Sequence, residues 1–117
     1  MTQKEKQLVL KDLSARLPYN PHIWVKDGKT LIAADIVLNG IYINDWITIP
    51  SCQNMTIKPY LRPIASMTSK EYKLYCKYLD KDPFYGESDF YNEYHFDYRE
   101  LIPKGLALEA PDDMYKK

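Results

Sequence analysis

The chain has 117 residues, 45% of them hydrophobic, which is enough to bury one sizeable core and excludes a largely disordered protein. Sixteen basic residues balance sixteen acidic ones, so the total charge points to no electrostatic partner. We therefore expect a single α+β domain over residues 1–117, with an N-terminal helix in 1–18, a β region in 22–60 and a helical region in 68–117.

The first expected element is a helix near residues 3–17. "TQKE" at 2–5 has the pattern of a capping box, in which Thr2 and the residue three positions later satisfy each other's backbone N–H groups. Leu10, Leu13 and Leu17 recur at helical spacing and are expected to pack on the core, while Pro18 ends the helix.

Between residues 22 and 60 the hydrophobic period changes to two and β-branched residues dominate, which predicts short strands. The expected strands are "HIWV", "TLIAADIVL", "IYINDWITI" and "MTIKPYL". Asn39-Gly40 favours a tight hairpin, "KDGK" favours a second one, and a bulge near Asn44-Asp45 would keep Asp45 out of the core. These features predict an antiparallel meander or a small SH3-like barrel.

The chain is expected to leave the sheet through Pro59 and Pro63, because proline donates no hydrogen bond to a β-ladder. A second capping box, Thr68 with Glu71, predicts a helix near residues 69–80. One side of that helix is apolar and the opposite side carries lysines. The apolar side comprises Tyr72, Tyr75, Cys76 and Leu79, and the other side Lys70, Lys73 and Lys77.

A last helical region is expected near residues 89–102, with Ser88 capping its first part and Asp97, together with Glu100, capping its second. Pro103 and Gly105 then end the helix. In this interpretation "HFDYRELIPKGLALEAP" at 95–111 closes the core. Its apolar contribution comes from Leu101, Ile102, Leu106 and Leu108, and Arg99 pairs with a neighbouring acid.

The histidine and aspartate of that segment invite a catalytic or metal-binding interpretation. His95 and Asp97 are only two candidate ligands, and the one other histidine, His22, lies in the β region. No nucleophile elbow, phosphate-binding glycine loop or zinc-protease motif accompanies them. Cys52 and Cys76 form no paired motif and are expected to be free thiols. We therefore expect a non-enzymatic protein with no catalytic residue, metal or cofactor.

No apolar run approaches the length of about 18 residues that spans a membrane, and the N-terminus has no apolar signal region, so a cytoplasmic protein is expected. Three blocks, "LVLKDLSARLPY", "IKPYLRPIASMT" and "HFDYRELIPKGLALEAPDDMY", resemble a group of small uncharacterised proteins encoded by Bacteroides genomes and by the phages and prophages of those bacteria. The resemblance implies a bacterial cytoplasm and a mobile genetic element. It implies no activity, cofactor or catalytic residue.

The charge is distributed unevenly, because the balance is +5 over residues 1–79 and −5 over 80–117. Residues 80–100 hold seven acids, two bases and seven interleaved aromatic residues. This composition suits a protein-binding patch, although the same aromatic residues would also fill a core. The candidate binding residues are Tyr85, Asp89, Tyr91, Glu93 and Tyr94, and burial of all three tyrosines would remove the basis for the patch.

The preferred functional hypothesis is an interaction module that acts on a host or defence protein. The alternative is a nucleic-acid-binding β-barrel in which exposed Trp24, Tyr42 and Trp46 stack on bases. Its basic residues are scattered rather than clustered along the strands, which makes this alternative the weaker one.

Overall fold

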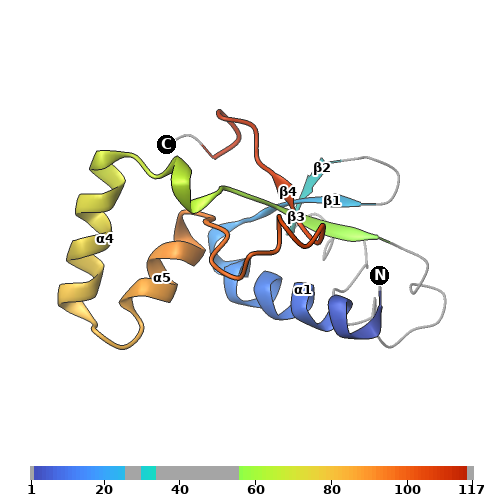
Figure 1. Cartoon of the computed structure of the whole chain (residues 1–117), viewed down its shortest axis with the longest axis horizontal. Helices are drawn as coiled ribbons and strands as arrows, with labels where there is room; N and C mark the ends of the chain where they lie inside the picture. Colours follow the sequence, from blue (N-terminus) through green and yellow to red (C-terminus); the bar gives the residue numbers. More distant parts are fainter. Residues whose placement is uncertain (1, 26–29, 34–55, 116–117) are drawn as a thin grey trace.

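The computed structural model describes residues 2–25, 30–33 and 56–115, and these residues form an α+β fold (Figure 1). Its elements are α1 (Gln3–Arg16), η1 (Leu17–Tyr19), β1 (His22–Val25), β2 (Thr30–Ile32), β3 (Ile57–Leu61), η3 (Ile64–Ser66), α4 (Ser69–Lys81), α5 (Gly86–Glu93) and β4 (Leu108–Glu109). The expected Asn39-Gly40 hairpin and the bulge at Asn44-Asp45 lie outside the described residues.

Helix α1 begins with the expected capping box. The Glu5 N–H donates to the Thr2 hydroxyl at 3.1 Å, and the Thr2 N–H donates to the Glu5 carboxylate at 2.8 Å. The buried face differs from the expected leucine stripe, because Val9 and Leu13 are fully buried whereas Leu17 is 38% exposed. Leu17 fails to pack inward because it falls at the C-cap, where a 3₁₀ turn redirects the chain.

The four described strands lie in the order β2-β1-β3-β4. β1 pairs antiparallel with β2 and also with β3. The turn expected at "KDGK", residues 26–29, lies outside the described residues. β4 instead runs parallel to β3. The antiparallel pairing expected within residues 22–60 is confirmed for β1, β2 and β3. The structure adds a strand that the sequence does not predict, since β4 arrives from residues 108–109 after a long connection, and an SH3-like barrel is not seen among the described strands.

Pro59 lies within β3, so the expectation that the chain leaves the sheet at this residue is wrong. The carbonyl of Leu61 accepts from Ala110 N on the β4 side. Because a strand alternates with a period of two residues, the backbone nitrogen of Pro59 faces the same side as the Leu61 carbonyl, towards β4. The pairing with β4 begins only at Tyr60. The missing N–H therefore costs no bond of the described ladder, and a proline is tolerated in a central strand.

Helix α1 packs against the sheet, and the core lies between them (Figure 1). The core comprises Val9, Leu13, Ile23, Val25, Ile57, Leu61, Leu101, Leu106 and Ala107. Full burial of one such leucine or isoleucine stabilises the fold by about 1.5–3 kcal/mol. This cluster is the main source of stability in the described part of the chain.

A charged network is buried beside that core. Asp12, fully buried on α1, accepts from Arg16 through both carboxylate oxygens at 2.9 and 3.0 Å, and from Arg99 at 2.7 Å. Arg16 is also fully buried and donates to the carbonyl of Phe96 at 2.6 Å. Arg99 thus pairs with an acid, as expected, but with one that is 87 residues away in the sequence.

The segment after α5 is not helical, so the helix expected over 89–102 is wrong beyond Glu93. Glu100 has a left-handed φ of 58°, which is incompatible with the position in the first turn of a helix that was expected for it. Asp97 still has a capping role, because its two oxygens accept from the backbone N–H groups of Leu101 and Ile102 at 2.8 and 2.9 Å. Leu101 is consequently fixed in the core, with no exposed surface.

Tyr115 fixes the last described residues to the sheet. Its hydroxyl accepts from the His22 N–H at 2.7 Å and donates to the Tyr60 carbonyl at 2.8 Å. Its ring stacks on the buried His95 imidazole with 3.8 Å between centroids. His95 therefore packs inside the fold against the C-terminal segment. No helix in the described ranges combines the length and the apolar character needed to cross a membrane.

Candidate protein-interaction surface

Helices α4 and α5 form a hairpin at one end of the molecule, away from the sheet (Figure 1). Thr68 and Glu71 form the expected capping box at the start of α4. Glu71 also accepts a bidentate ion pair from Arg62, at 2.6 and 2.8 Å, which joins the hairpin to the end of β3. Hydrogen bonds from Arg62 lower the pKa of the Glu71 carboxyl to about 2, so the pair is charged at neutral pH.

Aromatic rings hold the two helices together. Phe90 of α5 is fully buried, and the Tyr75 and Tyr78 rings of α4 meet it edge-on, each with 5.4 Å between centroids. The Tyr75 hydroxyl donates to Glu87 at 2.8 Å, and that of Tyr78 donates to Glu93. Desolvation, followed by these carboxylate bonds, raises the pKa of both hydroxyls, so both stay protonated as donors.

The turn between α4 and α5 is fixed by its own hydrogen bonds. The Asp82 carboxylate accepts from the backbone N–H groups of Phe84 and Tyr85, at 3.1 Å each. Gly86 begins α5 so close to α4 that a Cβ there would lie 2.2 Å from the Tyr78 carbonyl oxygen. The expected cap at Ser88 is wrong, because α5 starts at Gly86, three residues before the expected start, and Tyr85 stands at the N-cap.

This turn presents two adjacent aromatic side chains to solvent. Phe84 is 88% exposed and Tyr85 is 68% exposed. The residues around them are acidic, since residues 80–93 contain five carboxylates and one lysine. We call this region the tip, and it comprises Asp82, Phe84, Tyr85, Glu87 and Asp89. The tip lies at the end of the hairpin, away from the sheet, so the other described elements leave it accessible (Figure 1).

The five candidate binding residues separate into two groups. Tyr85 and Asp89 are exposed and belong to the tip. Tyr91, Glu93 and Tyr94 are half-buried, and all three contact residues of the hairpin. The three tyrosines are therefore not all buried, and the patch hypothesis keeps its basis in Tyr85. Sequence reasoning did not select Phe84, although its place in the turn "DPFYG" is the signal that identifies it.

The apolar side expected for α4 is only partly confirmed. Tyr75 and Leu79 are half-buried, as is Cys76, which carries a free thiol. Tyr72 is 57% exposed, because α4 packs mainly on α5 and this first-turn residue lies outside that contact. The other cysteine, Cys52, lies outside the described residues.

A hollow of about 510 Å³ separates the start of α4 from the C-terminal segment. Arg62, Glu71, Tyr94, Glu109 and Tyr115 contribute to its walls. Arg62 and Glu71 bind each other, so the two most enclosed charges of the hollow are already neutralised. No group of three potential metal ligands from His, Cys, Asp and Glu occurs among the residues that the structure describes.

The nucleic-acid hypothesis rests on three aromatic residues of the β region. Trp24 is half-buried in β1, and Tyr42 and Trp46 lie outside the described residues. No protein-family model matches the sequence, and comparisons with curated proteins and with solved structures find no significant match. The function must therefore be inferred from the residues themselves.

Proposed function

We propose that this protein is a non-enzymatic protein-interaction module that binds its partner through the tip. The observation that carries the proposal is the exposure of Phe84 and Tyr85, 88% and 68%, side by side on a hydrogen-bonded turn. Exposed aromatic residues on a fixed backbone are typical anchors of protein interfaces, since little conformational entropy is lost when they bind.

The charge around the anchors indicates the chemistry of the partner. Asp82, Glu87 and Asp89 lie within five residues of the two rings in the sequence, so we expect the complementary surface to be an apolar pocket with basic residues at its rim. The resemblance to small proteins of Bacteroides and their phages supports a setting in the bacterial cytoplasm, with a host or defence protein as the partner.

A non-enzymatic function is supported by the use that the fold makes of its candidate catalytic groups. Asp97 accepts two backbone N–H groups and His95 is stacked against Tyr115. The carboxylate of Asp12 likewise accepts hydrogen bonds from Arg16 and Arg99. These groups are committed to packing and to local hydrogen bonds.

Affinity capture with variants tests the proposal. The full chain is immobilised and exposed to cytoplasm of a Bacteroides host, and bound proteins are identified by mass spectrometry. The double variant Phe84→Ala/Tyr85→Ala should lose a protein that the wild type retains. Leu17→Ala, which removes an exposed apolar side chain at the end of α1, is the matched control and should retain it.

Raising the salt concentration should weaken the same interaction, because the acids of the tip would be screened. A protein that binds the double variant as well as the wild type would rule out the tip as the binding element. If the wild type retains no protein that the double variant loses, the proposed function is contradicted.

A further inference from the structure

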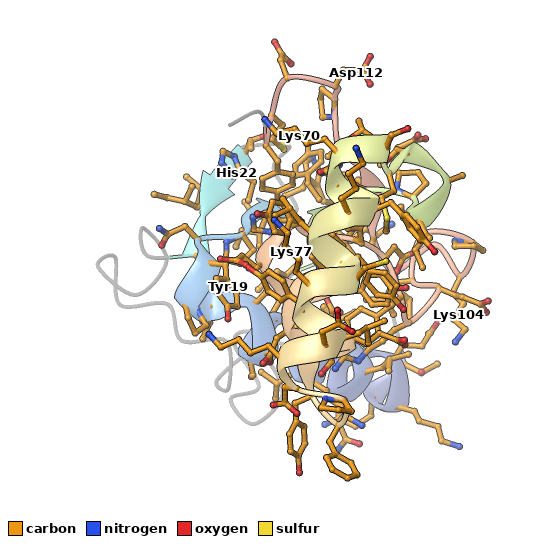
Figure 2. The ribbon with its side chains drawn as sticks, turned by 90° about the vertical axis from the view of Figure 1, so that its left-hand side faces the viewer. Tyr19, His22, Lys70, Lys77, Lys104 and Asp112 are labelled. Atoms are coloured by element: carbon orange, nitrogen blue, oxygen red, sulfur yellow. The ribbon has the colours of Figure 1, made fainter. Side chains whose placement is uncertain are left out.

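The C-terminal segment consists of a buried part and an outer part. Leu106 and Ala107 belong to the hydrophobic core, whereas no residue of 108–115 is buried. The outer part begins with β4 and then extends away from α1 (Figure 1), and Figure 2 shows Asp112 at its outer end. We call residues 108–115 the latch. Because burial ends between two neighbouring residues, the latch can move while the core stays intact.

Few contacts hold the latch to the sheet. β4 has only two residues and is an outer strand of the described sheet. Beyond β4, the Ala110 N–H donates to the Leu61 carbonyl at 2.8 Å. Within the described ranges, the other hydrogen bonds from the latch to the sheet involve the Tyr115 hydroxyl, and the Tyr115 ring stacks on His95. Tyr115 is therefore the main anchor of the far end of the latch.

The Tyr115 hydroxyl occupies a position in the ladder between β1 and β3. Ile23 faces Pro59 in antiparallel register, so His22 faces Tyr60. Pro59 has no N–H, which makes its pair with Ile23 a non-hydrogen-bonded pair and the next one, His22 with Tyr60, a hydrogen-bonded pair. In such a pair the His22 N–H donates directly to the Tyr60 carbonyl. Here the hydroxyl stands between them, accepting at 2.7 Å and donating at 2.8 Å.

The two backbone groups therefore have two alternative sets of partners. With the latch in place, the His22 N–H and the Tyr60 carbonyl both bond the hydroxyl. With the latch withdrawn, they can bond each other as the ladder requires. Withdrawal of an anchor usually leaves buried polar groups without partners, which is costly, and this arrangement avoids that cost.

The ring of Tyr115 covers a polar residue. His95 is 4% exposed and lies under the ring, with 3.8 Å between centroids. Its imidazole has two nitrogens that can bond water, so withdrawal of the ring hydrates a polar group and leaves the apolar cluster covered. Both the ladder and the covered histidine thus tolerate an open latch.

We propose that the latch is a reversible lid, which opens while the rest of the described fold stays closed, and that a direct bond between His22 and Tyr60 stabilises the open state. The closed latch forms one wall of the hollow of about 510 Å³, through residues that include Glu109, Pro111 and Tyr115. Opening therefore gives access to the hollow and to the edge of β3 that β4 covers. No residue of the latch belongs to the tip, so the proposal is independent of the binding proposed above.

Native-state hydrogen exchange of the full chain, followed by NMR in low urea, tests the opening. The Ala110 and Leu106 amides make matched hydrogen bonds, to Leu61 at 2.8 Å and to Leu101 at 2.9 Å. Ala110 should be protected at least about tenfold less than Leu106, and its exchange should depend less on urea, because local opening exposes little surface. A smaller difference in protection, or an equal dependence on urea, overturns the proposal.

Tyr115→Phe distinguishes a lid from a simple anchor, because it removes the hydroxyl and keeps the ring. The protection of the Ala110 amide should fall by at least about tenfold, whereas that of the His22 amide should stay within about threefold of wild type, since it now bonds Tyr60. Loss of protection at both amides overturns the alternative bond, and an unchanged Ala110 overturns the anchoring role of the hydroxyl. Asp113→Ala, at an exposed position in the latch, is the control and should change neither amide.

Thiol labelling tests whether the latch controls access to the hollow. Leu74 lines the hollow and is half-buried. In a Cys52→Ser/Cys76→Ser background, Leu74→Cys should react with a maleimide at least about threefold faster when Tyr115→Phe is also present. Tyr72→Cys, at an exposed position one turn from the chain entry to α4, is the control and should react at the same rate with and without Tyr115→Phe. Equal rates at residue 74 overturn the control of access.

Discussion

In the half of the molecule formed by α1 and the sheet, nine buried hydrophobic residues form one cluster, whereas α4 has no buried residue. The first half also encloses its charges, as the contacts of Asp12 with Arg16 and Arg99 show. The hairpin instead exposes Phe84 and joins its helices through rings and tyrosine–carboxylate bonds. The comparison teaches that the larger hydrophobic cluster lies in the sheet half, whereas α4 buries none of its residues and leaves the surface of the hairpin available for binding.

Removal of Asp12 should be the most damaging change to the sheet half. Asp12→Ala leaves Arg16 buried without its carboxylate, and loss of one partner from a buried pair costs about 3–5 kcal/mol. Urea denaturation followed by circular dichroism measures this loss. Asp113→Ala, at an exposed position, is the control and should change little. A loss below about 1 kcal/mol for Asp12→Ala would show that the network adds little to the stability of this half.

Truncation of a core leucine should have the next largest effect. Leu101→Ala removes a fully buried side chain and leaves a cavity, which should lower the free energy of unfolding by about 2–5 kcal/mol. Leu17→Ala makes the same chemical change at a partly exposed site and should cost much less. Equal losses at the two sites, measured in urea, would mean that the segment around residue 101 does not close the core.

The Arg62–Glu71 pair joins the two halves and should make stability depend on acid pH. The pKa of Glu71 falls from 4.5 to about 2 on folding, so its contribution is complete above pH 4.5 and is lost as the pH falls towards about 2. In Glu71→Gln, the melting temperature should depend less on pH over that interval than in the wild type. Glu109→Gln, at an exposed site, is the control. An unchanged pH profile for Glu71→Gln would show that the pair does not couple folding to pH.

The smallest expected effect on stability is at the tip. Phe84→Ala removes a ring that is 88% exposed, so the free energy of unfolding should change by less than about 0.5 kcal/mol. Phe90→Ala, six residues away and fully buried, should cost about 3–5 kcal/mol. Thermal melts of the two variants compare an exposed and a buried ring in one hairpin. A large loss for Phe84→Ala would mean that the ring is part of the fold and not a binding anchor.

The sequence predicts those parts of the fold that depend on neighbouring residues. Both capping boxes, Thr2 with Glu5 and Thr68 with Glu71, are confirmed, because they need only residues three positions apart. β1 and β3 also follow from local alternation. Their pairing with each other joins residues that are distant in the chain, and the antiparallel arrangement was correctly expected.

The errors arise where distant contacts override local signals. β4 was missed because it has only two residues and its pairing partner is β3, far away in the sequence. The sequence predicts helix over residues 89–102 because Asp97 and Glu100 have the pattern of a cap, but the backbone hydrogen bonds of Arg62 with His95 and Asp97 hold this segment beside the sheet. Of the candidate binding residues, Tyr85 and Asp89 lie on an exposed surface, whereas Glu93 is half-buried and accepts a hydrogen bond from Tyr78 inside the hairpin.

The buried arginine of α1 has a consequence for the order of events during synthesis. Arg16 and Asp12 leave the ribosome early, but their partners at Phe96 and Arg99 follow 80 and 87 residues later. Until then the Asp12–Arg16 pair should stay hydrated, because burying it before Phe96 and Arg99 complete its hydrogen bonds would be costly. Helix α1 therefore cannot reach its final place while the chain is still short. The fold should close late, in one step that joins the beginning of the chain to the segment around residue 96.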